Sequence, residues 1–321
     1  MRSKFLQIPL AAFATLFACS QLFGATSSSF SDTTGTSGNT ISAAANWTPP
    51  TISAVTVQKT QGGVADKIRG DGTFHVYANV ANVGSGSVTG SVTTIATTAS
   101  TTLASGSWTV AGTSYNYRSP QLTAKNTLSN TNYNITITAN DGVNTPVTFT
   151  DSVNAISSST VHNPTNFTTT NVGTSGKATT GDKMTFTFSN APDPESLFAG
   201  WDGTTRTVNV QLSDGGVFGW SSSTQDVVGI TDANGDVTAL GYVVLGGNYA
   251  NYGKSVTFPN STMVVTGNAY VVTLGTPSVS GDVATDTNNR SPVWTSYATL
   301  FNAWGRLSSA ATFNGTARRN F

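Results

Sequence analysis

Apolar and polar residues alternate in short stretches along most of the chain. In 181–197, Met184, Phe186 and Phe188 alternate with charged or hydroxyl side chains, and Pro192 and Pro194 follow. A period of two places the large side chains on one face of a strand, and proline ends a strand because its nitrogen carries no hydrogen to donate. We therefore expect a half-buried strand here, followed by a tight loop or a single helical turn.

The first half of the chain contains several segments of this kind. Positions 74–80 and 133–139 alternate cleanly, and Asp141-Gly142 is a turn signal. Other apolar positions in this half that indicate strands are Ile52, Val55, Val57, Val88, Val92, Ile95, Trp108, Val110, Tyr115, Tyr117, Val147, Phe149 and Val153. Roughly seven short strands within 48–155 are typical of a β-sandwich, either Ig-like or fibronectin-III-like.

The second half predicts another sandwich over 166–310. Alternation in 208–212 is followed by two hairpin signals, one around 232–236 and one at 266–268. Trp294 and Ala298 indicate a closing strand. The Ser-rich segment 156–165 is expected to connect the two domains, and 311–321 is expected to be a disordered tail.

The N-terminus has the pattern of a secretory signal. A basic start, 1–4, precedes an apolar run, 5–17, which is shorter than the roughly 20 residues of a membrane-spanning helix. We expect a signal peptide over 1–25, a Ser/Thr/Gly-rich linker over 26–47 and a secreted chain with no transmembrane segment. Residues 16–19 loosely resemble a lipobox, so Cys19 is a candidate for lipidation; cleavage between 20 and 25 would remove it. Because Cys19 is the sole cysteine, no disulfide within the chain is expected.

Low charge narrows the classes of function. Charged residues make up 9% of the chain and the net charge is zero. Nothing in this balance would neutralise a phosphate backbone, so nucleic acid is not an expected partner.

Several motifs carry a family resemblance. The strand 181–189 followed by 193–201, together with 208–210, 240–241, 261–264 and 272–276, resembles a bacterial Ig-like domain of the Big_5 type, known mainly from actinobacterial surface proteins. Segments 59–63, 74–79, 114–119 and 136–141 resemble an Ig-like module that precedes it in related proteins. The resemblance implies two tandem Ig-like β-sandwiches outside the cell, and it supplies no catalytic residues. Where the related domains end in a turn of the type D-x-x-G-N, this chain has 302–306 instead.

The start of the predicted linker carries a weaker resemblance. Segments 24–26, 29–32 and 38–44 are similar to the beginning of secreted proteins with a SipW-type signal, which include biofilm-matrix proteins. A plain flexible linker has the same composition.

Candidate chemistry is sparse. No Gly-x-Ser-x-Gly elbow or phosphate-binding loop is present, and the two histidines, His75 and His162, are expected to be solvated. Asp193 and Glu195 could serve as an acid and base pair in a hydrolase, but their place after a strand favours a loop or capping role. We therefore expect no catalytic residues, no enzyme activity and no cofactor.

Two sets of residues are candidate binding groups. Asp232, Asn234 and Asp236 have the spacing of the first three calcium ligands of a calcium-binding loop, although the later glycine and glutamate are missing, and a plain hairpin turn explains them as well.

Trp220, Tyr249 and Tyr252 lie in predicted loops, where exposed aromatic rings could stack on sugars. Trp108 and Trp294 fall in strand patterns and are expected in the core.

The sequence thus predicts a secreted, non-enzymatic surface or extracellular-matrix protein that acts in adhesion, spacing or assembly. Its expected partners are other surface proteins, copies of itself or cell-wall glycan. The alternatives are a carbohydrate-binding accessory protein and an unrecognised hydrolase.

Overall fold

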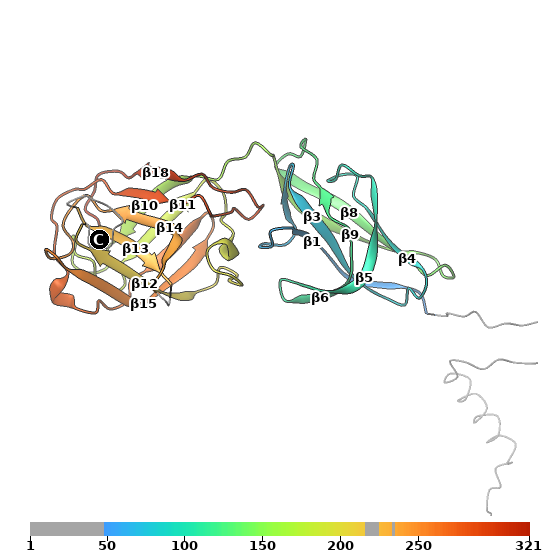
Figure 1. Cartoon of the computed structure of the whole chain (residues 1–321), viewed down its shortest axis with the longest axis horizontal. Helices are drawn as coiled ribbons and strands as arrows, with labels where there is room; N and C mark the ends of the chain where they lie inside the picture. The colour runs from blue at the N-terminus through green and yellow to red at the C-terminus, as the bar shows by residue number, and fades with distance from the viewer. Residues whose placement is uncertain (1–47, 216–224, 233–234) are drawn as a thin grey trace, which may run out of the picture.

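The computed structural model describes residues 48–215, 225–232 and 235–321. The predicted signal peptide and linker, Cys19, Trp220 and Asn234 lie outside the described residues. The described chain is all-β, with two separate β-sheet domains that follow one another along the long axis of the molecule (Figure 1).

The first domain contains strands β1 to β9. They are β1 (Thr51–Lys59), β2 (Lys67–Arg69), β3 (Thr73–Ala81), β4 (Ser87–Ser91), β5 (Ser100–Val110), β6 (Thr113–Arg118), β7 (Leu122–Thr123), β8 (Thr131–Asn140) and β9 (Val147–Ile156). Their hydrogen-bonded order is β1-β3-β6-β5-β4-β8-β9-β2, and β7 pairs with β3.

Strand β5 joins the two layers of this domain. Its first residues, 100–103, pair with β4, whereas 104–110 pair with β6, with a register irregularity between Ser105 and Trp108. The layers enclose a core of alternating side chains, as the period of two predicts, including Val57, Phe74, Val76, Ile135 and Ile137.

The second domain contains strands β10 to β18 and two short 3₁₀ turns. They are β10 (Pro164–Thr170), β11 (Lys183–Phe188), η1 (Pro194–Ser196), β12 (Arg206–Ser213), β13 (Val227–Thr231), β14 (Val237–Val244), β15 (Ser255–Thr266), β16 (Ala269–Thr273), η2 (Ser280–Asp282), β17 (Val293–Ser296) and β18 (Ala311–Asn314). Their order is β10-β11-β16-β15-β12-β13-β14-β17-β18, and the two end strands lie close together. Neither turn in the described residues is long enough to cross a membrane.

Aromatic side chains fill the core of the second domain. Phe186 and Phe188 of β11 both contact Trp294 edge-on, with ring centroids 5.1 Å apart in each pair. The indole nitrogen of Trp294 donates a hydrogen bond to the carbonyl oxygen of Leu240 at 2.8 Å, so this buried polar group is satisfied. The core position expected for Trp294 is therefore confirmed, whereas Trp108 is only partly buried, against Tyr77 and Tyr115.

The C-terminal residues differ from the expected disordered tail. Strand β18 pairs with β17, and the last two residues, Asn320 and Phe321, are buried. The Phe321 ring packs edge-on against Tyr249, with centroids 5.7 Å apart. Backbone pairing of Arg318 with Arg290 and burial of the Phe321 ring hold the segment, and neither contact produces an alternation that the sequence could show.

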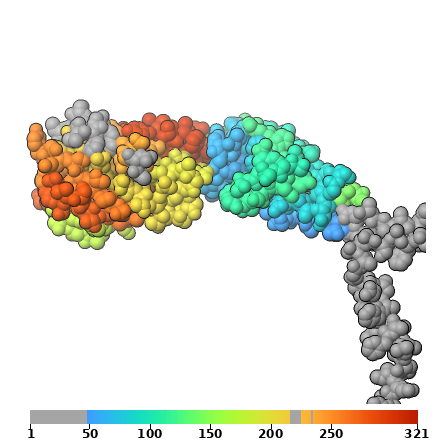
Figure 2. Space-filling view, turned by 60° about the horizontal axis from the view of Figure 1, so that its bottom comes forward, coloured from blue at the N-terminus to red at the C-terminus, as the bar shows by residue number. Residues whose placement is uncertain are grey.

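The predicted connector is also shorter than expected. Strand β9 extends to Ile156 and β10 begins at Pro164, so the segment between the domains is 157–163. The space-filling view shows the two domains in direct contact, and the described chain begins at one end of the molecule and finishes in the other domain (Figure 2).

Candidate functional site at the domain junction

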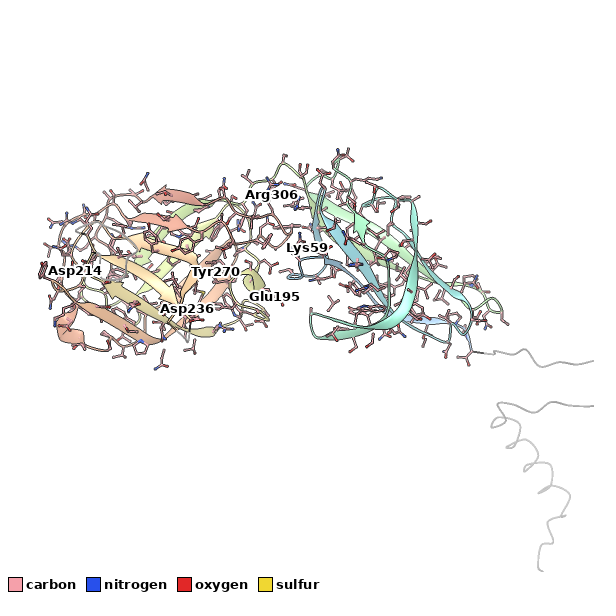
Figure 3. All side chains as sticks on the ribbon, in the orientation of Figure 1. Lys59, Glu195, Asp214, Asp236, Tyr270 and Arg306 are labelled. Carbon is pink, nitrogen blue, oxygen red and sulfur yellow. The ribbon has the colours of Figure 1, made fainter. Side chains whose placement is uncertain are left out.

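Polar groups of both domains contact one another where the domains meet. The first domain contributes the end of β1, the turn that follows it, β2 and one residue of β9, while the second contributes η1 and the loop 301–307 (Figure 3). We refer to this region as the junction; its residues are Lys59, Gly63, Lys67, Arg69, Asn154, Asp193, Glu195, Ala303, Trp304 and Gly305.

Lys59 is the centre of the junction. It is the last residue of β1 and only 4% exposed. Its ammonium group donates to the carbonyl oxygen of Val64 at 2.6 Å in its own domain and to that of Ala303 at 2.9 Å in the other. The carboxylate of Asp193 lies 3.9 Å away, at the limit of an ion pair.

Burial opposes the charges of this pair. It lowers the pKa of Lys59 to about 8, against the effect of the Asp193 and Glu195 carboxylates, and it raises the pKa of Asp193, against the effect of Lys59. Desolvation therefore outweighs attraction on both partners. Such a pair specifies how two surfaces fit more than it adds to stability, because removing one partner leaves the other buried and uncompensated.

Asp193 and Glu195 hold the second domain's side of the junction. The Asp193 carboxylate caps η1 by accepting from the backbone nitrogen of Glu195 at 3.2 Å, and Glu195 accepts from the backbone nitrogen of Gly63 across the junction at 2.8 Å. The core residue Tyr270 donates from its hydroxyl to the Asp193 carbonyl at 3.2 Å. Asp193 therefore has the capping role that the sequence favours. Glu195 also makes an interdomain contact, which the sequence did not predict.

The loop 301–307 provides a second set of interdomain contacts. The indole nitrogen of Trp304 donates to the side-chain oxygen of Asn154 at 2.7 Å, and the ammonium of Lys67 lies 4.4 Å from the Trp304 ring centroid. The guanidinium of Arg69 donates to the carbonyl oxygen of Gly305 at 3.1 Å. The loop thus contacts β2 and β9 of the first domain through both side chains and backbone.

Two glycines allow the surfaces to approach. Gly63 (φ +81°) and Gly305 (φ +83°) have left-handed backbones. A Cβ on Gly63 would lie 1.7 Å from the Asp193 carboxylate, and one on Gly305 would lie 2.8 Å from the Lys59 side chain. Glycine is therefore required here by both backbone conformation and space.

An open groove of about 810 Å³ runs beside these contacts. Tyr77 and Val110 line it from the first domain, and Pro194 and Trp201 from the second. The residues lining it include no histidine or cysteine that could activate a hydroxyl group, and no group of His, Cys, Asp and Glu in the described residues could hold a metal ion. Its polar lining residues include Lys59, Asp193 and Glu195, the same side chains that join the two domains.

The candidate aromatic residues are not brought together. Tyr249 is fully buried in the second core, which contradicts the exposed position expected for it, because its ring packs against the terminal Phe321. Tyr252 is 97% exposed.

Asp232 and Asp236, the candidate calcium residues that the structure describes, lie between β13 and β14. The backbone nitrogen of Asp236 donates to the Asp232 carboxylate at 3.0 Å, and the backbone nitrogen of Asp232 donates to the Asp236 carbonyl at 2.9 Å. This is the hairpin alternative considered for these residues.

The histidines differ from the solvated positions expected. His75 is half-buried, and its Nδ1 lies 3.0 Å from the carbonyl oxygen of Ser119. His162 is 1% exposed and stacks on Phe188 with ring centroids 4.7 Å apart. Neither nitrogen of His162 has a hydrogen-bond partner among the described residues, and burial lowers its pKa to about 4.

Comparisons with known proteins give no family. No family model and no curated protein matches the chain. Among solved structures it is similar to one titled "Crystal structure of Dpr2 Ig1-Ig2 in complex with DIP-Theta Ig1-Ig3", at 10% identity over 85% of this chain and 100% of that one, with a TM-score of 0.22. A score this low carries no argument, so the all-β, two-domain architecture is argued from the strand pairing alone.

Proposed function

We propose that the protein is a secreted, non-enzymatic component of a bacterial surface or extracellular matrix, built from two Ig-like modules of which the second is of the Big_5 type. Its task is to space, adhere or assemble, with other surface proteins, copies of itself or cell-wall glycan as partners. The observation that carries this proposal is the junction, because its contacts join two sheet domains end to end into one elongated unit.

The junction limits the motion of the two domains relative to one another. Domains joined by a short segment alone move relative to one another, whereas a junction of specific hydrogen bonds and packed glycines limits that motion. A unit of fixed length suits a spacer or an adhesive protein, since its outer surfaces stay at a set distance from its point of attachment. Exposed strand edges add a route to assembly with a further strand.

Small-angle X-ray scattering and electron microscopy of the purified secreted protein test this proposal. We expect one elongated particle with a narrow length distribution, or filaments of such particles, and retention on bacterial cells or matrix. Particles with widely varying angles between the domains, together with no retention on cells, would exclude it. Turnover of glycosides or peptides would favour an enzyme instead.

Carbohydrate binding is the second candidate, and the full exposure of Tyr252 favours it. A flat ring in solvent can stack on a sugar. It predicts that the protein is retained on cell-wall polysaccharide and that Tyr252→Ala weakens retention without changing thermal unfolding. Tyr297→Ala, which also removes an exposed tyrosine from the second domain, is the matched control.

A further inference from the structure

Four neighbouring strands of the first domain present one uniform outward face. On β4 and β8, Val88, Ile135 and Ile137 point into the core, so the residues between them point out. We call this outward surface the hydroxyl face. Its residues are Ser100 and Thr102 of β5, Ser87, Thr89 and Ser91 of β4, Asn134, Thr136, Thr138 and Asn140 of β8, and Thr148, Thr150 and Ser152 of β9.

Strand register aligns these side chains in rows. One row runs Thr102–Thr89–Thr138–Thr148 and the next runs Ser100–Ser91–Thr136–Thr150, each crossing β5, β4, β8 and β9. Neighbouring strands are about 4.8 Å apart, and residues two apart on one strand are separated by roughly 6.7 Å. The hydroxyls of Thr136 and Thr150 lie 3.4 Å apart, so they point to the same side at close range.

Three neighbouring strands of the second domain, β11, β16 and β15, lack such a surface among the described residues. Outward positions on β11, β16 and β15 include Lys183, Val271 and Val264, which interrupt any row of hydroxyls. The strand preference of threonine explains why it is common in this chain, but it does not explain rows in register across four strands. The hydroxyl face therefore distinguishes the first domain.

The chemistry of the face restricts its partner. It carries no charged and no aromatic side chain, so it offers neither charge complementarity nor a ring on which a sugar could stack. It offers hydroxyl, amide and methyl groups that repeat in two directions. The partner must then be uncharged and present hydrogen-bonding atoms that repeat in two directions with spacings of a few ångströms.

Crystalline water meets these conditions. Its oxygens repeat in two directions at spacings comparable to those of the rows, and each oxygen both donates and accepts, as a hydroxyl does. No charge has to be desolvated on contact, and ordered water can bridge neighbouring hydroxyls at little enthalpic cost. We propose that the hydroxyl face binds the surface of an ice crystal.

Sheet twist predicts which residues matter most. Adjacent strands are rotated by roughly 20–25° relative to one another, so a flat surface matches the middle of the sheet better than its margins. Thr89 of β4 and Thr138 of β8 are directly paired at the centre of the face. We expect substitutions there to weaken ice binding more than substitutions at Ser152, near its margin.

Ice-affinity partition and thermal hysteresis of the purified protein test the proposal. The protein should enter slowly grown ice, shape single crystals into facets and depress their growth temperature. Thr89→Lys and Thr138→Lys should abolish these effects, and Thr138→Val, which retains the shape and loses the hydroxyl, should reduce them. Thr185→Lys on β11 is the control, because it places the same charge on a half-exposed strand residue of the second domain.

Each variant is first shown to unfold at the temperature of the parent protein, so that a loss of function is not a loss of fold. Exclusion of the parent protein from ice overturns the proposal, as does full activity in both Thr89→Lys and Thr138→Lys. Retention on insoluble polysaccharide that is lost in Thr138→Lys, without any effect on ice, also overturns it and assigns the face to a glycan. Because none of these readouts depends on the domain junction, they are independent of the spacer proposal.

Discussion

At the scale of single residues, His162 is a buried polar group with no hydrogen-bond partner in the part of the chain that the structure describes. Burial lowers the pKa of His162 from its ordinary value of 6.5 to about 4, so the imidazole is neutral in the folded protein. Below pH 6.5 His162 is protonated in the unfolded chain but stays neutral in the folded protein. The free energy of unfolding therefore falls as the pH drops from 6.5 to 4. The full effect is on the order of 3 kcal/mol.

We predict that His162→Leu reduces this loss of stability in acid. Leucine fills similar space against Phe188 and has no nitrogen to protonate, so at neutral pH the variant should be as stable as the parent protein or more so. Urea unfolding at pH 4.5 and pH 7 measures the difference. Burial raises the pKa of both Asp151 and Asp226 to about 6, which acts in the opposite direction, but both groups remain in the two proteins and cancel in the comparison. Equal acid sensitivity in both proteins would contradict the assignment.

At the scale of elements, alternation was a good guide where strands are half-buried. It located β3, β8 and β11, whose side chains alternate between core and solvent. It missed β10, in which Phe167 is the one fully buried side chain among threonines and asparagine, and the short strands β2 and β18. A strand with one apolar anchor has no period to detect.

The junction was also beyond sequence reasoning. Its contacts join residues separated by 132 positions (Gly63 to Glu195) and by 244 positions (Lys59 to Ala303), and no local pattern encodes such pairs. Two signals pointed to it in retrospect. One is the Gly62-Gly63 doublet in the turn that follows β1, and the other is the segment 302–306.

Comparing two glycine substitutions distinguishes the effect of backbone strain from the effect of a lost interdomain contact. Gly63→Ala and Gly112→Ala both place alanine at a left-handed φ, which costs roughly 1–2 kcal/mol. At Gly112 a Cβ meets nothing within 4 Å, whereas at Gly63 it meets the Asp193 carboxylate of the other domain. We therefore expect only Gly63→Ala to change the distance between spin labels placed on the two domains. The same distance distribution in both variants would mean that the turn has no role in docking.

At the scale of the whole molecule, the question is whether the two domains unfold together. Each has its own core, so each could fold alone, and the buried groups of the junction are what couple them. Lys59→Met keeps the apolar length of the side chain but removes the donor to Ala303 and leaves Asp193 buried beside no cation. We expect a loss of about 1–3 kcal/mol of coupling, because an acceptor and a carboxylate lose their partner.

Calorimetry should then show one unfolding transition in the parent protein and two in Lys59→Met, with a wider distribution of interdomain distances. Lys183→Met, at an exposed lysine of β11, should behave as the parent protein does.

The pH dependence of stability at alkaline pH tests the role of Lys59 a second way. Because burial in the folded protein lowers the pKa of Lys59 to about 8, the folded protein binds fewer protons than the unfolded chain, so its stability should rise as the pH increases from 8 towards 10.5. That dependence should be absent in Lys59→Met, and its persistence there would assign the titration to another group.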